Sequence, residues 1–237
     1  MKQEKFTRKS DPMEKVYLDA ENIIKSYKNK RGENIVLDNL SLHIEGGKFY
    51  AVVGESGSGK STLLSILSGL QKPNSGSVIY KTGEEDGIRI DELSDDQLTK
   101  LRRHDIVYIP QTQDILPYLT VGENIRLVDN FDEDKNDDEL SKVSRLSLIL
   151  EELGITELER EYPSVLSGGE LRRLCIARTL YSEPKIILAD EPTNDLDKDN
   201  RDILRNIFRS IANKGVAVVV VTHDPELASA ADEVIRL

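Results

Sequence analysis

Three glycines, a lysine and a serine lie close together near residue 60, in a pattern that suits the binding of phosphate groups. The segment is Gly54-Glu55-Ser56-Gly57-Ser58-Gly59-Lys60-Ser61-Thr62, which contains the pattern GxxxxGK[ST]. Glycines let a backbone turn around a phosphate with its N–H groups facing inward, Lys60 can reach the β- and γ-phosphates, and Ser61 can ligate Mg²⁺. Apolar residues before and after it predict a strand over Phe49–Val53 and a helix over Ser61–Leu70. These flanks argue against a chance Gly/Ser-rich loop, and the segment predicts a nucleoside triphosphate site.

Two carboxylates follow another apolar stretch much later in the chain. Ile186–Ala189 leads directly into Asp190 and Glu191. The carboxyl ends of strands form the edge where ligands bind in α/β folds. We therefore expect Asp190 to hold Mg²⁺, through water, and Glu191 to orient or deprotonate the attacking water. A simple polar end to a strand is the alternative, which the phosphate-binding pattern disfavours.

Two further polar residues come directly after predicted strands. Gln111 follows Ile106–Ile109 and Pro110, and it can offer its carbonyl oxygen to Mg²⁺ and its amide to the attacking water. His223 ends the stretch Val216–Thr222 and can donate a hydrogen bond to the γ-phosphate. Taken alone, each is an ordinary surface residue. Taken with Glu191, they complete a predicted catalytic set of Glu191, His223 and Gln111.

A second helix start carries two glycines, in the segment Leu166-Ser167-Gly168-Gly169-Glu170. Ser-x-x-Glu is by itself an ordinary capping box. Glycines directly after the cap weaken a helix start, so their presence indicates that something approaches this backbone closely. We expect that to be a γ-phosphate held by a second copy of the chain, with Ser167, Gly168, Gly169 and Glu170 in contact with the nucleotide.

The composition limits the classes of partner. The 237 residues carry a formal net charge of −11, which argues against binding to nucleic acid, since that needs a basic surface. No apolar run approaches the roughly 18–20 residues that span a bilayer. The single cysteine, Cys175, excludes an internal disulfide, and its apolar neighbours predict a core position. The charged residues 1–15 predict a flexible N-terminal tail.

The rest of the chain predicts one α/β domain over residues 16–237. Extended segments over about 16–47 predict an N-terminal antiparallel β-subdomain, and alternating strands and helices from Lys48 predict a parallel sheet. This pattern is interrupted over about 112–165, where helices are predicted at Val121–Leu127 and Glu139–Leu153. That stretch is expected to be an inserted α-helical subdomain.

In their order along the chain, these motifs resemble the ATP-binding-cassette (ABC) ATPase family, whose fold has a P-loop NTPase core. The corresponding motifs are Walker A (Gly54–Thr62), the Q-loop (Gln111), the signature (Leu166–Glu170), Walker B (Ile186–Glu191), the D-loop (Asn194–Asp197) and the switch histidine (His223). The signature is close to diagnostic for the family. The resemblance implies ATP and Mg²⁺ as cofactors and a head-to-tail dimer that encloses ATP between Walker A of one copy and the signature of the other. It also implies an aromatic residue that stacks on adenine, in the place held by Tyr27, whose alternative role is a surface aromatic of the β-subdomain.

Within the family, the chain is most similar to cassettes of lipoprotein-releasing and macrolide-exporting transporters. This class implies a membrane permease partner, a position on the cytoplasmic face of the membrane, and a groove in the helical insertion for a short permease helix. A regulatory cassette of the cell-division type, which signals without moving cargo, stays open. Two departures stand out: Asn194-Asp195 replaces the usual Gly-Asn, and Arg172-Arg173-Leu174 replaces Gln-Arg-Val, which we expect to alter only the helix surface. The chain also ends where relatives usually continue briefly, as expected for the ATPase part of a longer polypeptide.

Overall fold

The protein folds around two β-sheets. The computed structural model describes residues 16–29, 32–83, 87–131 and 138–237, so the predicted N-terminal tail lies outside the described residues. An antiparallel sheet has the order β2-β1-β4-β5 and a parallel sheet the order β6-β7-β8-β3-β9. The antiparallel strands are β1 (Val16–Asn29), β2 (Gly32–Glu45), β4 (Ser75–Thr82) and β5 (Ile88–Arg89). The parallel strands are β3 (Phe49–Val53), β6 (Ile106–Ile109), β7 (Ile186–Asp190), β8 (Ala217–Val221) and β9 (Glu233–Arg236).

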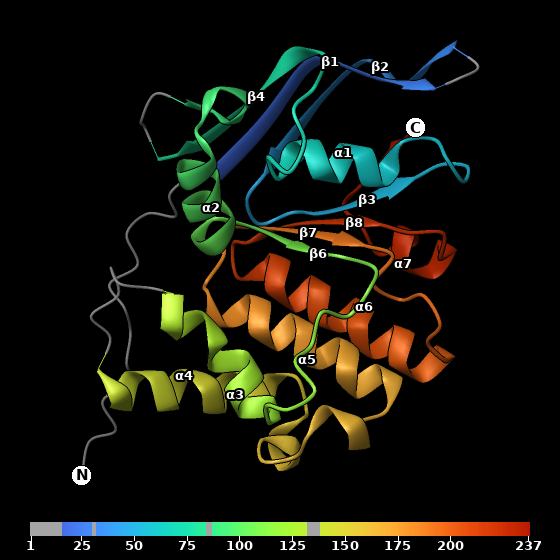
Figure 1. Cartoon of the computed structure of the whole chain (residues 1–237). Helices are drawn as coiled ribbons and strands as arrows, with labels where there is room; N and C mark the ends of the chain where they lie inside the picture. The colour runs from blue at the N-terminus through green and yellow to red at the C-terminus, as the bar shows by residue number, and fades with distance from the viewer. Residues whose placement is uncertain (1–15, 30–31, 84–86, 132–137) are drawn as a thin grey trace.

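The described residues contain seven α-helices. They are α1 (Lys60–Leu67), α2 (Asp95–His104), α3 (Val121–Arg126), α4 (Glu139–Glu152), α5 (Gly168–Tyr181), α6 (Lys198–Asn213) and α7 (Pro225–Ser229). Helix α1 lies between the two sheets, whereas α5 and α6 lie against the opposite face of the parallel sheet (Figure 1). The α/β class with separate parallel and antiparallel sheets, predicted from the sequence, is thus confirmed.

Two apolar cores follow from this arrangement. One joins α1 to both sheets, since Leu64 of α1, Val78 of β4 and Leu188 of β7 belong to a single cluster. The other joins the far face of the parallel sheet to the helices below it, as Ile187 packs in a cluster with Leu174 and Phe208. Strands β7 and β8 are buried along their whole length, as their continuous apolar sequences require. Cys175 is buried in α5, as predicted.

The parallel register brings separate parts of the chain to one edge of the sheet. Asp190 at the end of β7 is paired with Val221 of β8, which is paired in turn with Val52 of β3. The segments that follow these strands, which start at Gly54, Glu191 and Thr222, therefore leave the sheet together. This edge is where the sequence predicts the catalytic residues.

Most predicted elements agree with the structure, with differences at their ends. The predicted strands at Phe49–Val53 and Ile106–Ile109 have these bounds. The predicted end of the first helix at Leu70 is wrong, since α1 ends at Leu67. Gly69 has a left-handed φ of +68°, which ends the helix, and the Leu70 side chain is exposed. Helices α3 and α4 occupy the two predicted positions in the insertion. Within the described residues, no helix is both long and apolar enough to cross a membrane.

Candidate active site

A cavity of about 490 Å³ opens at the carboxyl edge of β3, β7 and β8. It is lined by Val36, Ser56, Gly57, Gly59, Lys60, Ser61, Thr62, Gln111, Asp190, Glu191, Asn194, Val221 and His223. The structure thus brings together the phosphate-binding segment and all four polar residues predicted from strand ends. The other residues predicted to contact the nucleotide are not among the lining residues; they are Gly54, Glu55, Ser58, Tyr27 and Ser167 to Glu170.

The phosphate-binding segment is shaped by its contact with β2. Gly59 has a φ of +98°, and a Cβ atom there would lie 2.7 Å from Cγ1 of Val36, so only glycine fits. The next residue, Lys60, begins α1 and is 6% exposed. Its ammonium donates hydrogen bonds to the carbonyl oxygens of Gly54, at 3.0 Å, and Glu55, at 2.8 Å. The loop therefore holds a fixed positive charge at the N-terminus of α1, a place that favours phosphate.

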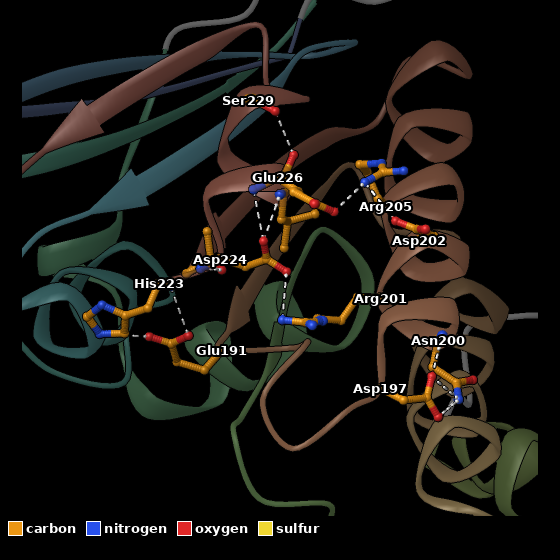
Figure 2. Close-up of polar contacts among 12 residues, drawn as sticks. Glu191, Asp197, Asn200, Arg201, Asp202, Arg205, His223, Asp224, Glu226 and Ser229 are labelled. Atoms are coloured by element: carbon orange, nitrogen blue, oxygen red, sulfur yellow. Dashed lines mark hydrogen bonds and ion pairs between the residues drawn. The ribbon is translucent and has the colours of Figure 1, made fainter.

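Glu191 and His223 form a pair at the cavity (Figure 2). Nε2 of His223 lies 3.2 Å from Oε1 of Glu191, and the His223 backbone N–H donates to Oε2 at 3.3 Å. Glu191 has a left-handed φ of 46°, and its own N–H donates to the carbonyl oxygen of Val221. Burial raises the pKa of Glu191, and the nearby His223 partly opposes this shift. A carboxylate with a raised pKa is a better acceptor for a proton from water.

The loop that carries His223 is anchored to α6. Asp224 caps α7 by accepting hydrogen bonds from the backbone of Glu226 and Leu227, and it lies 3.8 Å from Arg201 of α6. Arg205, one turn further along α6, lies 3.5 Å from Glu226 (Figure 2). These contacts connect the end of β8 to the helix that follows Asp197, so they restrain the position of His223.

Asp190 has the environment of a metal-binding carboxylate. It is 5% exposed, and its Oδ1 atom has no hydrogen-bond partner among the described residues. Its Oδ2 atom accepts a hydrogen bond from the hydroxyl of Tyr108, at 3.2 Å. Burial and the neighbouring Asp190 raise the pKa of Tyr108 to about 12. An unpaired buried carboxylate oxygen in a cavity with Ser61 and Gln111 fits Mg²⁺.

No group of three or more His, Cys, Asp or Glu side chains that could bind a metal occurs in the described part of the chain. Mg²⁺ typically needs only one or two carboxylates because substrate phosphates and waters supply the rest. The residues present therefore suit an ion that arrives with a nucleotide.

From the sequence, the departure at Arg172-Arg173-Leu174 is predicted to alter only the helix surface. The burial of Arg172 shows that this prediction is wrong. The Arg172 side chain is 3% exposed and points to the segment after β6. Its guanidinium donates to the carbonyl oxygens of Pro110, at 3.3 Å, and Gln111, at 3.1 Å. Burial lowers the pKa of Arg172. The side chain thus ties α5 to the backbone that carries Gln111, whose own side chain reaches the cavity.

The signature segment lies outside this cavity, and of its residues Ser167 and Gly168 are exposed whereas Leu166 and Gly169 are buried. Ser167 caps α5 in a complete capping box with Glu170, as the sequence predicts. A contact within the same chain explains why residue 169 is a glycine. A Cβ atom at this position would lie 2.1 Å from Oδ1 of Asn200 in α6. The close approach expected from a partner's phosphate is therefore not needed to explain Gly169. Gly168 is exposed, and the nearest atom to a Cβ at this position would be in Leu196, at 3.9 Å. Contact with a partner's phosphate therefore stays a prediction for Ser167 and Gly168.

Tyr27 lies on β1 with 40% of its surface exposed. Its hydroxyl donates to Oε1 of Gln71, and the ammonium of Lys25 lies 5.4 Å from the ring centre. Val36, on the neighbouring strand, lines the cavity instead. An aromatic ring on this sheet can stack on a base, and that role stays a prediction.

Replacing Tyr27 with alanine is expected to weaken ATP binding by about 1–3 kcal/mol, the scale of base stacking on an aromatic ring. Tyr27→Phe keeps the ring and loses only the hydrogen bond to Gln71, so it should bind nearly as the parent does. Calorimetry with ATP measures both affinities. Tyr118→Ala is a suitable control because Tyr118 is exposed and does not line the cavity. If both Tyr27 variants bind ATP as the parent does, the stacking residue lies elsewhere.

Three residues of the site carry no signal in their sequence setting. Val36 is one apolar residue among several in β2. Tyr108 stands at a strand position that an apolar aromatic would suit equally, and Arg172 follows a capping box where an exposed side chain is expected. Each matters through a contact with a distant part of the chain, at Gly59, Asp190 and Gln111 respectively.

Comparison with known proteins agrees with this geometry. Residues 37–194 match the protein family described as ABC transporter. The chain is 38% identical over 221 residues to HrtA of Staphylococcus haemolyticus, which is named as a hemin import ATP-binding protein, covering 93% of this chain and 96% of HrtA. It is 39% identical over 208 residues to the macrolide export ATP-binding/permease protein MacB of Mannheimia succiniciproducens, covering 87% of this chain but 31% of MacB.

Solved structures of a third relative show the same fold. The ATP-binding cassette MJ0796 superposes with a TM-score of 0.82 at 35% identity, over 93% of this chain and 94% of that chain. MJ0796 comes from Methanocaldococcus jannaschii. One of its structures is a dimer, and another is a dimeric post-hydrolysis state bound to ADP and Pi.

Proposed function

This chain belongs to the ABC transporter family as an ATP-binding, ATP-hydrolysing cassette, and we propose that two copies close on ATP to drive a membrane permease in export or extraction. The proposal rests on one observation: the residues predicted to bind ATP lie in two separate places on the same chain. Lys60, Asp190, Glu191 and His223 share one cavity, whereas Ser167 and Gly168 are exposed outside it. A second copy can supply Ser167 and Gly168 to a phosphate held in that cavity.

We assign the steps of hydrolysis to residues of the cavity. The ammonium of Lys60 and the N–H groups of residues 54–62 bind the β- and γ-phosphates. Ser61, Gln111 and Asp190 hold Mg²⁺, which neutralises charge on the phosphates when it is bound. Glu191 accepts a proton from the attacking water, and its raised pKa suits that step. The backbone N–H of His223 holds Oε2 of Glu191, at 3.3 Å, and the imidazole of His223 donates to the γ-phosphate.

The proposed dimer gives the signature its role. Ser167 and Gly168 lie at the exposed N-terminus of α5, where the helix dipole favours an anion. The Ser167 hydroxyl donates to Oε2 of Glu170 at 2.7 Å and would turn to a partner's phosphate, whereas Gly168 offers a bare backbone. The relative MJ0796 has been solved as a dimer. We place these residues against the γ-phosphate held by the other copy, and Tyr27 against the adenine ring.

The substitution Gly168→Asp should block hydrolysis while ATP binding to the monomer is unchanged. The site around Gly168 is open, so the new side chain fits the monomer, but its charge repels a partner's γ-phosphate. ATP affinity measured at low protein concentration should equal that of the parent, and ATPase activity at high concentration should be lost.

Gly168→Ala is the matched control, because it adds a small uncharged side chain at the same open position. It should retain more activity than Gly168→Asp, because it places no negative charge against the partner's phosphate. Substitution of Gly169 would not serve here, since any Cβ atom there meets Asn200 of the same chain. Loss of ATP binding by the Gly168→Asp monomer would contradict the shared site.

We propose that the permease docks beside the helical insertion, residues 112–165. Leu127 and Val128 line a cavity of about 250 Å³ together with Tyr108 of β6 and Arg178 of α5. Arg102 and Arg103 of α2 also line it, which suits a permease helix that carries acidic residues. Such a partner would place the protein peripherally at the cytoplasmic face of the membrane. The names of the relatives differ in direction, and the proposal of export rests on those of the MacB type.

Reconstitution tests the transport role. The chain is co-expressed with a candidate permease of the macrolide-exporter type, and the complex is placed in liposomes. Export or extraction predicts that ATP hydrolysis is accompanied by release of a substrate from the membrane or across it. Hydrolysis stimulated by a cell-wall hydrolase regulator, without movement of cargo, would contradict it.

A further inference from the structure

The register between β6 and β7 brings Tyr108 to Asp190. Tyr108 is paired with Leu188 in the parallel ladder. Paired residues of neighbouring strands point to the same face of a sheet, and so does the residue two positions further along, which is Asp190. Tyr108 and Leu188 accordingly belong to the core on the α1 side of the sheet. The phenol is long enough to extend past Leu188, and its hydroxyl donates to Oδ2 of Asp190 at 3.2 Å.

The carboxylate of Asp190 depends on this hydrogen bond for its orientation. It is almost fully buried, and its Oδ1 atom has no hydrogen-bond partner among the described residues. The terminal torsion of an aspartate is soft, so an unsupported carboxylate can turn either oxygen toward a ligand. A buried oxygen without a partner is costly, and the Tyr108 hydroxyl removes that cost at Oδ2 alone. The two oxygens are thereby made unequal before any ligand binds.

We propose that Tyr108 is a positioning residue, which holds Oδ2 of Asp190 so that Oδ1 remains available to nucleotide-bound Mg²⁺ or to a water of that ion. This inference rests on the proposed role of Asp190 in holding Mg²⁺. Tyr108 is not among the residues that line the cavity, so it acts through Asp190. Partners of metal-binding carboxylates commonly change metal affinity by about 10–100-fold when they are removed.

The hydroxyl can be separated from the ring by one substitution. Tyr108→Phe keeps the ring at the edge of the core and removes only the donor to Asp190. We expect the Mg²⁺ concentration for half-maximal binding of a non-hydrolysable ATP analogue to rise about tenfold or more. Binding of the same analogue in EDTA should not change. Calorimetry measures both, and it needs no hydrolysis.

A second tyrosine provides a matched control. The Tyr181 hydroxyl donates to Oδ2 of Asp129 at 2.9 Å, and its ring packs in the other core. Tyr181→Phe therefore removes the same kind of hydrogen bond away from the cavity, and it should leave the Mg²⁺ dependence unchanged. In an Asp190→Ala background, which lacks the acceptor, Tyr108→Phe should have no further effect.

Each result decides between the alternatives. A loss of affinity confined to the Mg²⁺ measurement and absent in the Asp190→Ala background supports the proposal. An unchanged Mg²⁺ dependence of Tyr108→Phe overturns it, and so does equal weakening with Mg²⁺ and in EDTA, which would indicate a packing role. If the parent binds the analogue equally with and without Mg²⁺, the metal role of Asp190 itself fails, and this inference fails with it.

Discussion

The substitution Lys60→Ala should abolish measurable ATP binding by this chain. Lys60 is the fixed positive charge of the phosphate loop, and its ammonium already has its place against the carbonyl oxygens of Gly54 and Glu55. Charge-assisted hydrogen bonds contribute about 1.5–3 kcal/mol each, so the loss of those to two phosphates should weaken binding roughly 100-fold or more. Calorimetric titration with ATP gives this affinity directly.

Lys72→Ala is the control for this experiment. Lys72 is an exposed lysine that does not line the cavity, so its removal changes the net charge equally and should leave the affinity unchanged. Thermal unfolding of both variants would show whether the loop retains its structure without the ammonium. If Lys60→Ala binds ATP with the affinity of the parent, the assignment of the phosphate loop is wrong.

The sequence predicts the parallel sheet well because the central strands of that sheet are continuous apolar segments. Strands buried on both faces need unbroken apolar runs, and β3, β7 and β8 have them. The last strand, β9, was not predicted. Its four residues are largely exposed, and it is held by pairing with β3, so its own sequence carries little information. Edge strands of this kind are determined by the sheet that they join.

The candidate site likewise contains some residues that the sequence predicts and others that it does not. Residues whose type and spacing suit a chemical task, such as Lys60, Asp190 and Glu191, can be found without coordinates, and the structure brings them to one cavity. Tyr108 and Arg172 could not be found, since each depends on a register or a helix rotation that the sequence does not express. Arg172 is the sharper case. Its position after a capping box predicts exposure, yet the rotation of α5 buries it against the backbone of Gln111.

The substitution Glu191→Gln should separate ATP binding from hydrolysis. Glutamine has the size of glutamate and can still accept the hydrogen bond from the His223 backbone, so the left-handed turn at residue 191 is retained. In the proposed mechanism, Lys60 would still hold the phosphates and Asp190 the metal. Only the acceptor for the proton of water is lost, and a general base contributes about 10²–10⁴-fold to a rate. Hydrolysis should fall by that factor while ATP affinity is retained.

Because the bound ATP is not consumed, the variant should also accumulate as a dimer. Size-exclusion chromatography with light scattering should give a mass near 26.7 kDa without nucleotide and about twice that with ATP. Glu183→Gln is a matched control, since Glu183 is another glutamate with a positive φ, 57°, and lines a different cavity. It should hydrolyse ATP as the parent does. Hydrolysis by Glu191→Gln at the parent rate would show that another group activates the water. A variant that binds ATP yet stays monomeric at high concentration would show that the isolated chain does not form the shared site, and that a membrane partner is needed to bring Ser167 and Gly168 of one copy to the phosphates of the other.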